Sequence, residues 1–271
     1  KIIKKNVLNI EEKDLKKIDF IFHLASIAND NMGDLRQEIT WEISCLGTMK
    51  LLEFAIKNKV KKIIFASSAS VYGIKKEKLV TEKLSLEPIS VYNKAKMITE
   101  RTLLSYSNYI DVCIIRPATV CGLSPRMRFD LSVNMLTYQA LKNNVITVFG
   151  GSQIRPNIHL DDLIDIYLFF LKRNNFKNGI FNAGFENLSI LNIAKKVTKY
   201  IPAKIRILKN NKDKRSYRID SSKILKTGYK PNKKVNDAIE EINNYYSLYP
   251  NMINEKCFSV DWLKKNQYKF L

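Results

Sequence analysis

The chain has 271 residues, with 46 Lys and Arg against 26 Asp and Glu, so its net charge is +20. Hydrophobic residues make up 45% of the chain, a globular proportion that excludes a disordered protein. Four cysteines without a CxxC pair, two histidines and no long apolar run argue against a zinc site, a disulfide scaffold or a membrane helix. We therefore expect a cytoplasmic protein with no metal site and no membrane partner.

The positive charge does not define a binding surface. It comes from 36 lysines and only 10 arginines, scattered along the chain in pairs such as Lys61-Lys62 and Lys195-Lys196. This pattern is typical of an AT-rich coding sequence, whereas a nucleic-acid-binding face would gather basic residues with aromatic ones. A basic nucleic-acid-binding protein stays open as an alternative function.

Apolar strands alternate with amphipathic helices along the first two-thirds of the chain. This order predicts parallel βα units with both faces of the sheet covered. The predicted strands are 18–25, 60–66, 112–116 and 145–149, and the predicted helices are 40–57, 91–107, 131–142 and 160–172. An extended segment at 179–182, a helix at 188–200, short strands at 204–208 and 217–219, and a helix at 235–246 follow.

Polar turns follow three of the predicted strands, at 23–26, 67–68 and 116–119. Ligands of open parallel sheets bind beyond the carboxyl ends of the strands, so these turns should line one crevice.

A Tyr and a Lys stand four residues apart at the start of a predicted helix, which places Tyr92 and Lys96 on one helical face. A phenol ordinarily has a pKa near 10, and a neighbouring ammonium favours its ionised form. Ser68, at a neighbouring strand end, would bond the same substrate hydroxyl. Such a trio suits removal of a proton from an alcohol that loses hydride.

Several collinear motifs accompany this trio. The chain carries SSASVYG at 67–73, HLA at 23–25, GTxxLLE at 47–53, RP at 116–117, GGSQIRPNIHLDD at 150–162 and FNAG at 181–184. Over about residues 6–230 it thus resembles the extended short-chain dehydrogenase/reductase family, the nucleotide-sugar epimerases and dehydratases.

The resemblance implies an α/β fold, a Rossmann-type doubly wound parallel sheet with a small C-terminal α/β substrate domain. Residues 1–150 would form the NAD(P)-binding domain, and residues 151–271 mainly the substrate-binding region, with some segments returning to the Rossmann sheet. The family's first βαβ unit, with its GxxGxxG turn, does not occur in the 271 residues. We expect that about 45 to 60 further residues precede Lys1 in the whole protein, and that the 271 residues alone are inactive.

The resemblance also assigns roles to single residues. Tyr92 would be the catalytic base and acid, Lys96 would bind the nicotinamide ribose, and Ser68 would donate to the substrate hydroxyl. The other implied cofactor contacts are Asn6, Val7, Leu24, Ala25, Ser26, Ser67 and Pro117. The other implied substrate contacts are Thr119, Asn134, Arg155 and Arg215. No metal ligands are implied.

Departures from the family pattern narrow the reaction. The 4,6-dehydratases carry Asp-Glu where this chain has Ala69 and Ser70, and 3,5-epimerases carry Cys where it has Ser70. Oxidation and reduction at sugar C4 remain, as a 4-epimerase or as a one-way 4-dehydrogenase or ketoreductase. The implied cofactor is NAD, with NADP not excluded, and the implied assembly is a homodimer. The run 118–130 with Arg155-Pro156 resembles a subgroup that makes sugars of bacterial surface polysaccharides.

Overall fold

The computed structural model describes residues 2–173, 178–209 and 216–266. It divides into two compact units, and each is described by itself. The first unit holds residues 2–73, 82–116 and 166–181, and the second holds residues 74–81, 117–165 and 182–266, apart from the undescribed positions. No helix among the described residues combines the length and apolarity that crossing a membrane requires.

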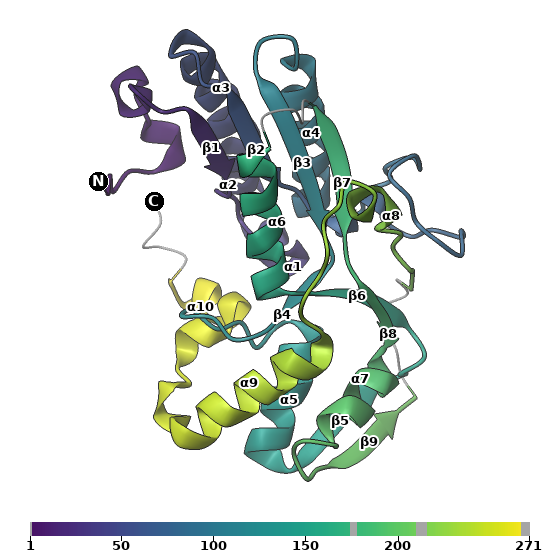
Figure 1. Ribbon diagram of the computed structural model, residues 1–271. Helices are drawn as coiled ribbons and strands as arrows, with labels where there is room; N and C mark the ends of the chain where they lie inside the picture. Colours follow the sequence, from purple (N-terminus) through teal and green to yellow (C-terminus); the bar gives the residue numbers. More distant parts are fainter. Residues whose placement is uncertain (1, 174–177, 210–215, 267–271) are drawn as a thin grey trace. The chain divides into compact units, whose positions relative to one another are not determined.

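A four-stranded sheet forms the centre of the first unit, in the order β1-β2-β3-β7 (Figure 1). Strands β1, β2 and β3 run parallel, with His23 opposite Phe65 and Phe65 opposite Ile114. Their carboxyl ends therefore meet at one edge of the sheet. The strands are β1 (Phe20–His23), β2 (Lys62–Ala66), β3 (Asp111–Pro117) and β7 (Gly179–Ala183).

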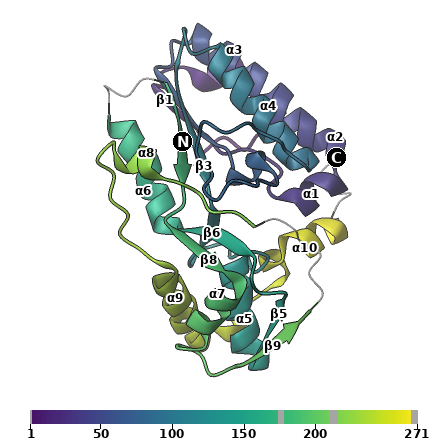
Figure 2. The same cartoon turned by 90° about the vertical axis from the view of Figure 1, so that its right-hand side faces the viewer.

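Helices cover both faces of this sheet. In Figure 2, α3 and α4 lie together on one side of it, and α6 lies on the other. The Lys62 ammonium of β2 donates to the carbonyls of Phe170 (3.1 Å) and Arg173 (2.7 Å), at the end of α6. The helical segments are η1 (Val7–Asn9), η2 (Glu12–Leu15), α1 (Asp30–Leu35), α2 (Gln37–Trp41), the π-helical turn η3 (Glu42–Leu46), α3 (Gly47–Lys57), η4 (Ala69–Tyr72), α4 (Val91–Ser105) and α6 (Leu160–Lys172).

The second unit combines two small sheets with several helices. Its first sheet has the order β4-β6-β8, and its second pairs β5 with β9 in parallel. The strands are β4 (Thr119–Cys121), β5 (Val145–Phe149), β6 (Ile154–His159), β8 (Glu186–Ser189) and β9 (Lys204–Leu208). The helical segments are α5 (Ser132–Asn143), α7 (Ile190–Val197), α8 (Ser222–Leu225), α9 (Val235–Leu248), η5 (Pro250–Met252), η6 (Glu255–Cys257) and α10 (Ser259–Asn266).

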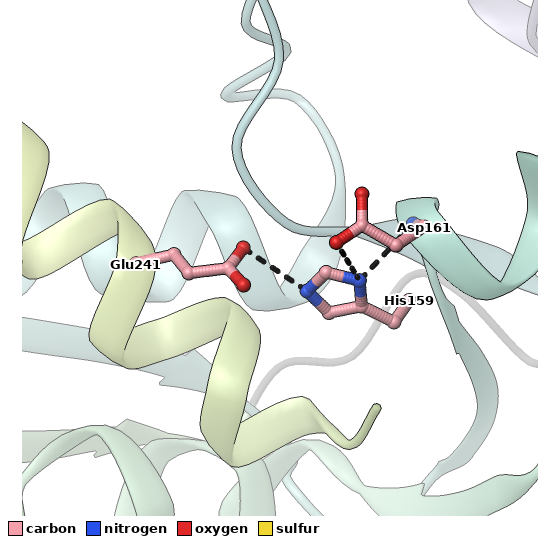
Figure 3. A group of neighbouring side chains, drawn as sticks. All are labelled: His159, Asp161 and Glu241. Carbon is pink, nitrogen blue, oxygen red and sulfur yellow. Dashed lines mark hydrogen bonds and ion pairs between the residues drawn. The ribbon is translucent and has the colours of Figure 1, made fainter. Parts of the chain in front are cut away.

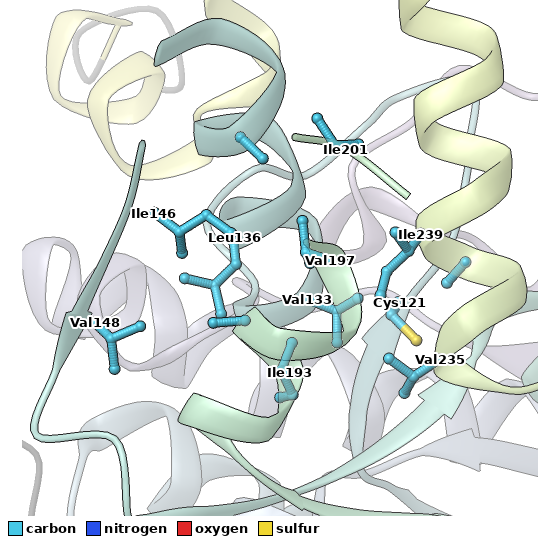
Figure 4. Packing of buried hydrophobic residues seen from close by; sticks show 13 residues of the cluster. Cys121, Val133, Leu136, Ile146, Val148, Ile193, Val197, Ile201, Val235 and Ile239 are labelled. Carbon is cyan, nitrogen blue, oxygen red and sulfur yellow. The ribbon is translucent and has the colours of Figure 1, made fainter. Parts of the chain in front are cut away.

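The core of the second unit lies among α5, α7 and α9 (Figure 4). Leu136, Ile193 and Ile239, one from each helix, are fully buried there, and Val148 of β5 packs against them. Burial of a Leu or Ile side chain contributes about 1.5 to 3 kcal/mol. These helices therefore hold the second unit together largely by apolar packing.

The predicted fold class is confirmed, because both the parallel sheet and the helix layers are present. The segment 145–149 is a strand as predicted, but it pairs with β9 in the second unit. The predicted strand at 217–219 is reduced to one bridge, between Val80 and Ile219. The division of the chain at residue 150 into a cofactor-binding part (1–150) and a mainly substrate-binding part (151–271) stays a prediction.

Candidate active site

Ser68 lies directly beyond the carboxyl end of β2. It is the N-cap of the short helix η4, and its hydroxyl oxygen accepts from the backbone N–H of Ser70 at 3.2 Å. Serine suits this position because its short side chain satisfies a free N–H of the first turn. The strand end and the helix start thus hold Ser68 at the edge where parallel sheets bind ligands.

Helix α4 begins at the same edge and carries Tyr92 and Lys96 in its first turns. Ser90 caps the helix by accepting from the Asn93 N–H at 3.2 Å. The Lys96 ammonium lies 5.8 Å from the centre of the Tyr92 ring, and it donates to the Ala66 carbonyl at 2.7 Å. Ala66 is two residues before Ser68, so the structure brings Ser68, Tyr92 and Lys96 to one region of the first unit.

Lys96 is buried although it carries a titratable amine, with 4% of its surface exposed. Burial lowers the pKa of Lys96 to about 7, although the charge of Glu100 acts in the opposite direction. An ammonium has three donors, and Ala66 O is the acceptor that Nζ reaches among the described residues. Nζ also lies 4.7 Å from the centre of the Phe65 ring. The Ala66 carbonyl and this ring do not use all three donors at full strength, so the amine can still bond an oxygen of a ligand.

A buried ion pair lies next to this region. Arg116 of β3 donates to Glu100 of α4 through Nε (2.9 Å) and Nη2 (2.5 Å), and through Nη1 to the Tyr72 hydroxyl (2.8 Å). The Ser67 hydroxyl also donates to Glu100. Burial alone would lower the Arg116 pKa, but the hydrogen bonds and charge of Glu100 raise it above its ordinary value. This network ties α4 to the ends of β2 and β3.

The cofactor contacts expected near β1 lie on a more open surface. Leu24 is 55% exposed and Ala25 is exposed, while the Ser26 hydroxyl donates to the Ile27 carbonyl at 3.2 Å. Asn6 caps η1 by accepting from the Leu8 N–H at 3.0 Å. Val7 packs close to Gly47, the first residue of α3. These positions leave the cofactor roles of the five residues as predictions.

His23 ends β1 and has a structural environment. Its Nε2 lies 2.7 Å from the hydroxyl of Thr48, and that hydroxyl already donates to the Ser44 carbonyl. Nε2 is therefore the donor of the first bond. Burial and, to a smaller extent, the charge of Lys96 lower the pKa of His23 to about 4. A histidine that stays neutral and packs on Phe65 fits a strand-end role better than acid–base chemistry.

Three further expected substrate contacts, Thr119, Asn134 and Arg155, lie in the second unit. Thr119 begins β4, opposite Asn157 of β6. The Asn134 amide accepts from the Gly122 N–H (3.2 Å) and donates to the Arg128 carbonyl (3.1 Å), so it fixes the preceding loop. Arg155 lies on β6, half-buried. The expected cofactor contact Pro117 ends β3 and is also half-buried, and the expected substrate contact Arg215 lies outside the described residues.

Figure 3 shows His159, Asp161 and Glu241, whose ligand atoms lie within 4.8 Å of one another. Nδ1 of His159 accepts from the Asp161 N–H at 3.1 Å, so Nε2 carries the proton and donates to Glu241 at 3.1 Å. The Lys233 ammonium binds the same carboxylate at 2.8 Å. Both ring nitrogens and the carboxylate therefore have partners, and the group joins α9 to the β6–α6 junction by hydrogen bonds.

Sequence reasoning missed the ion pair of Glu100 and Arg116 and the partners of Ser70 and Asn93. Glu100 follows Lys96 by four residues, so it shares the buried face of α4. Arg116 follows the buried apolar run 112–115 of β3. A charged residue in each of two apolar surfaces that face one another is a signal of a buried pair. The bond from the Ser70 hydroxyl to the Asn93 amide oxygen had no such signal.

A parallel sheet with Ser68, Tyr92 and Lys96 at its carboxyl edge is the Rossmann-type arrangement of short-chain dehydrogenases and reductases. The NAD dependent epimerase/dehydratase family matches residues 3–184 of the chain. The chain belongs to this family.

Relatives and solved structures agree with that membership. A UDP-glucose 4-epimerase of Lactobacillus helveticus is 29% identical over 206 residues, covering 68% of this chain and 62% of the relative. An uncharacterised UDP-glucose epimerase of Bacillus subtilis, YtcB, is 34% identical over 169 residues, covering 60% and 52%. The UDP-glucuronic acid 4-epimerase of Bacillus cereus, solved with UDP-glucuronic acid and NAD, has a TM-score of 0.77 and 29% identity, covering 91% and 81%. The matches thus span 62% and 52% of the two curated relatives' lengths.

The buried ion pair gives a first prediction. Glu100→Gln and Arg116→Met should each destabilise the protein by about 3 to 5 kcal/mol, because each leaves a buried partner uncompensated. The double variant should cost less than the sum of the two. Urea denaturation followed by circular dichroism measures all four proteins, and strictly additive losses would show that the pair is not coupled.

The Lys96 environment gives a second prediction. Below about pH 7 Lys96 is charged in the folded protein, and burial of this charge lowers the free energy of unfolding by its full amount. In the unfolded chain Lys96 keeps its proton up to the ordinary lysine pKa of 10.5. Between these values the unfolded state binds more protons, so the free energy of unfolding gains up to about 1.4 kcal/mol per pH unit relative to Lys96→Met. Denaturation at pH 7 and pH 9 measures the difference.

Lys94→Met, on the exposed face of the same helix, is the matched control and should show no comparable change with pH. If wild type and Lys96→Met keep the same difference in unfolding free energy at both pH values, Lys96 does not titrate in this range.

Proposed function

We propose that this protein is an NAD-dependent nucleotide-sugar epimerase that oxidises and reduces the sugar at C4. The observation that carries the proposal is the grouping of Ser68, Tyr92 and Lys96, with the Lys96 ammonium beside the Tyr92 ring and bonded to the end of β2. The family membership and the 4-epimerases among the relatives support the same reaction. NAD is the proposed cofactor, and NADP stays possible because a solved relative of this fold was complexed with NADPH.

The proposed roles rest on the family resemblance, and the grouping of the three side chains supports them. Lys96 donates to ribose hydroxyls, and its charge favours the phenolate form of Tyr92. The Tyr92 phenolate takes the proton of the C4 hydroxyl while hydride leaves C4, which becomes a ketone. Bound NAD supplies the acceptor of that hydride and its later donor. When hydride returns to the opposite face of C4, Tyr92 gives the proton back and the sugar is epimerised.

A 4-dehydrogenase is the second candidate. A GDP-6-deoxy-D-talose 4-dehydrogenase of Aggregatibacter actinomycetemcomitans is 30% identical over 156 residues. The same trio performs one half of the epimerase reaction, so a one-way enzyme would release the keto sugar or bind it from solution. Epimerised product without net change in NADH identifies the epimerase, and stoichiometric NADH identifies the dehydrogenase.

The roles of the other residues remain part of the proposal. Pro117, Thr119, Asn134, Arg155 and Arg215 are proposed for nicotinamide and substrate binding. An Arg guanidinium suits a sugar nucleotide because it bonds two diphosphate oxygens together. The cytoplasm is the proposed compartment, because all four cysteines are free buried thiols. A role in surface-polysaccharide synthesis rests on the motif resemblance.

We expect Tyr92→Phe to reduce turnover by about 10²- to 10⁴-fold, because it removes the group that exchanges the proton. The test uses the complete gene product with NAD and a panel of UDP- and GDP-sugars, and follows the C4 epimer by NMR. Sugar-nucleotide affinity should change little. Tyr109→Phe is the control, since Tyr109 is 71% exposed. Turnover near wild type in Tyr92→Phe would refute the assignment.

A homodimer through helices α3 and α4 is also proposed. The two helices of the first unit lie side by side (Figure 2), and they expose Met49 (45%) and Ile98 (36%), next to Leu46 (56%) of η3. Exposed apolar side chains on adjacent helices are typical of an interface. Met49→Glu with Ile98→Glu should give monomers in light scattering. Ile164→Glu, at a residue 45% exposed on α6, should not, and a monomeric wild type would contradict the proposal.

A further inference from the structure

A chain of hydrogen bonds links Ser68 to the first turn of α4. The Ser68 and Ser70 hydroxyl oxygens are 2.7 Å apart. The Ser70 hydroxyl in turn donates to the side-chain oxygen of Asn93 at 2.5 Å. Asn93 follows Tyr92 in the sequence and is 1% exposed, whereas Ser68 and Ser70 are half-buried. The chain therefore runs from the proposed substrate side into the interior of the first unit.

The direction of each bond follows from the number of protons available. An amide oxygen only accepts, so the single proton of the Ser70 hydroxyl is committed to Asn93. The bond between the two serines must then use the Ser68 proton. Ser68 also accepts from the Ser70 N–H, which occupies one of its two lone pairs. One acceptor position remains on the Ser68 oxygen, and no donor remains.

We propose that Ser70 and Asn93 are positioning residues that hold the Ser68 hydroxyl as a hydrogen-bond acceptor toward the ligand. This inference rests on the proposed function in one respect, namely that the ligand is a sugar with a hydroxyl at C4. The chain ends on an amide oxygen, which does not take up a proton at neutral pH. It therefore orients the Ser68 proton and does not carry protons away from the site.

The orientation discriminates between the two oxidation states of the sugar. In the resting site a C4 hydroxyl donates its one proton to Ser68 and keeps its own lone pairs for other donors. That proton has to turn from Ser68 to Tyr92 before Tyr92 takes it. A C4 ketone only accepts, so it gains a bond from Ser68 only if Ser68 turns its proton away from Ser70. The resting site therefore favours the alcohol over the ketone. This is the reverse of the donor role expected for Ser68 from the sequence.

Neutron diffraction from crystals of the complete wild-type protein in heavy water tests the orientation without any ligand. We expect the deuteron of Ser68 to point at the Ser70 oxygen and the deuteron of Ser70 to point at Asn93. A Ser68 deuteron directed away from Ser70 would overturn the proposal. This result does not depend on turnover, so it separates a failure of the inference from a failure of the proposed function.

Titration calorimetry with NAD present tests the consequence for ligands. The probes are UDP-glucose and its 4-deoxy-4-fluoro analogue, which has lost the donor at C4. Wild type should bind UDP-glucose about three- to ten-fold more tightly, since a net hydrogen bond is worth about 0.5 to 1.5 kcal/mol. In Ser70→Ala and Asn93→Leu the Ser68 proton is released, and the ratio should fall toward one.

Ser70→Thr and Asn93→Asp are the matched controls, because each keeps the hydrogen-bonding atom and should keep the wild-type ratio. Circular dichroism confirms that each variant is folded. A ratio that stays at the wild-type value in folded Ser70→Ala and Asn93→Leu would overturn the proposal. If wild type binds neither probe and turns over no sugar nucleotide, the proposed function fails, while the deuteron positions still decide the inference.

Discussion

The Glu100–Arg116 ion pair is the interaction on which the geometry of the first unit depends. A buried guanidinium cannot lose its proton, so its carboxylate partner has to stay within bonding distance. Glu100 lies one turn after Lys96, and Arg116 lies at the carboxyl end of β3. The pair therefore fixes the position of α4 relative to β3, and with it the position of Lys96 at the end of β2.

The same carboxylate extends the constraint to the neighbouring turn. Glu100 accepts a hydrogen bond from the Ser67 hydroxyl, and Arg116 donates one to the hydroxyl of Tyr72, the last residue of η4. Ser68 lies between these two anchored residues. Its backbone position is thus set by charge-assisted bonds on both sides, while Ser70 and Asn93 set only the direction of its hydroxyl. Position and proton direction are controlled by different groups, so substitutions could alter one without the other.

Much of the fold was predictable from periodicity and length. The helix at 160–172 and the strand at 145–149 have the predicted bounds, because their apolar patterns end at charged residues or glycines. The partner of that strand was not predictable, since a short apolar run pairs equally well in either unit. In the site, the spacing of four residues between Tyr92 and Lys96 was enough to predict that both lie on one face of a helix. The Ser70–Asn93 bond depends on two side-chain rotamers 23 residues apart, which no local pattern encodes.

The chain passes between the two units at 73/74, 81/82, 116/117, 165/166 and 181/182. Three of these passages fall inside β3, α6 and β7 and not in loops. Neither unit therefore corresponds to a single stretch of gene that recombination could move to another protein. A new ligand preference in such a chain would have to arise by substitutions within the existing segments, because the segments of the two units alternate along the sequence.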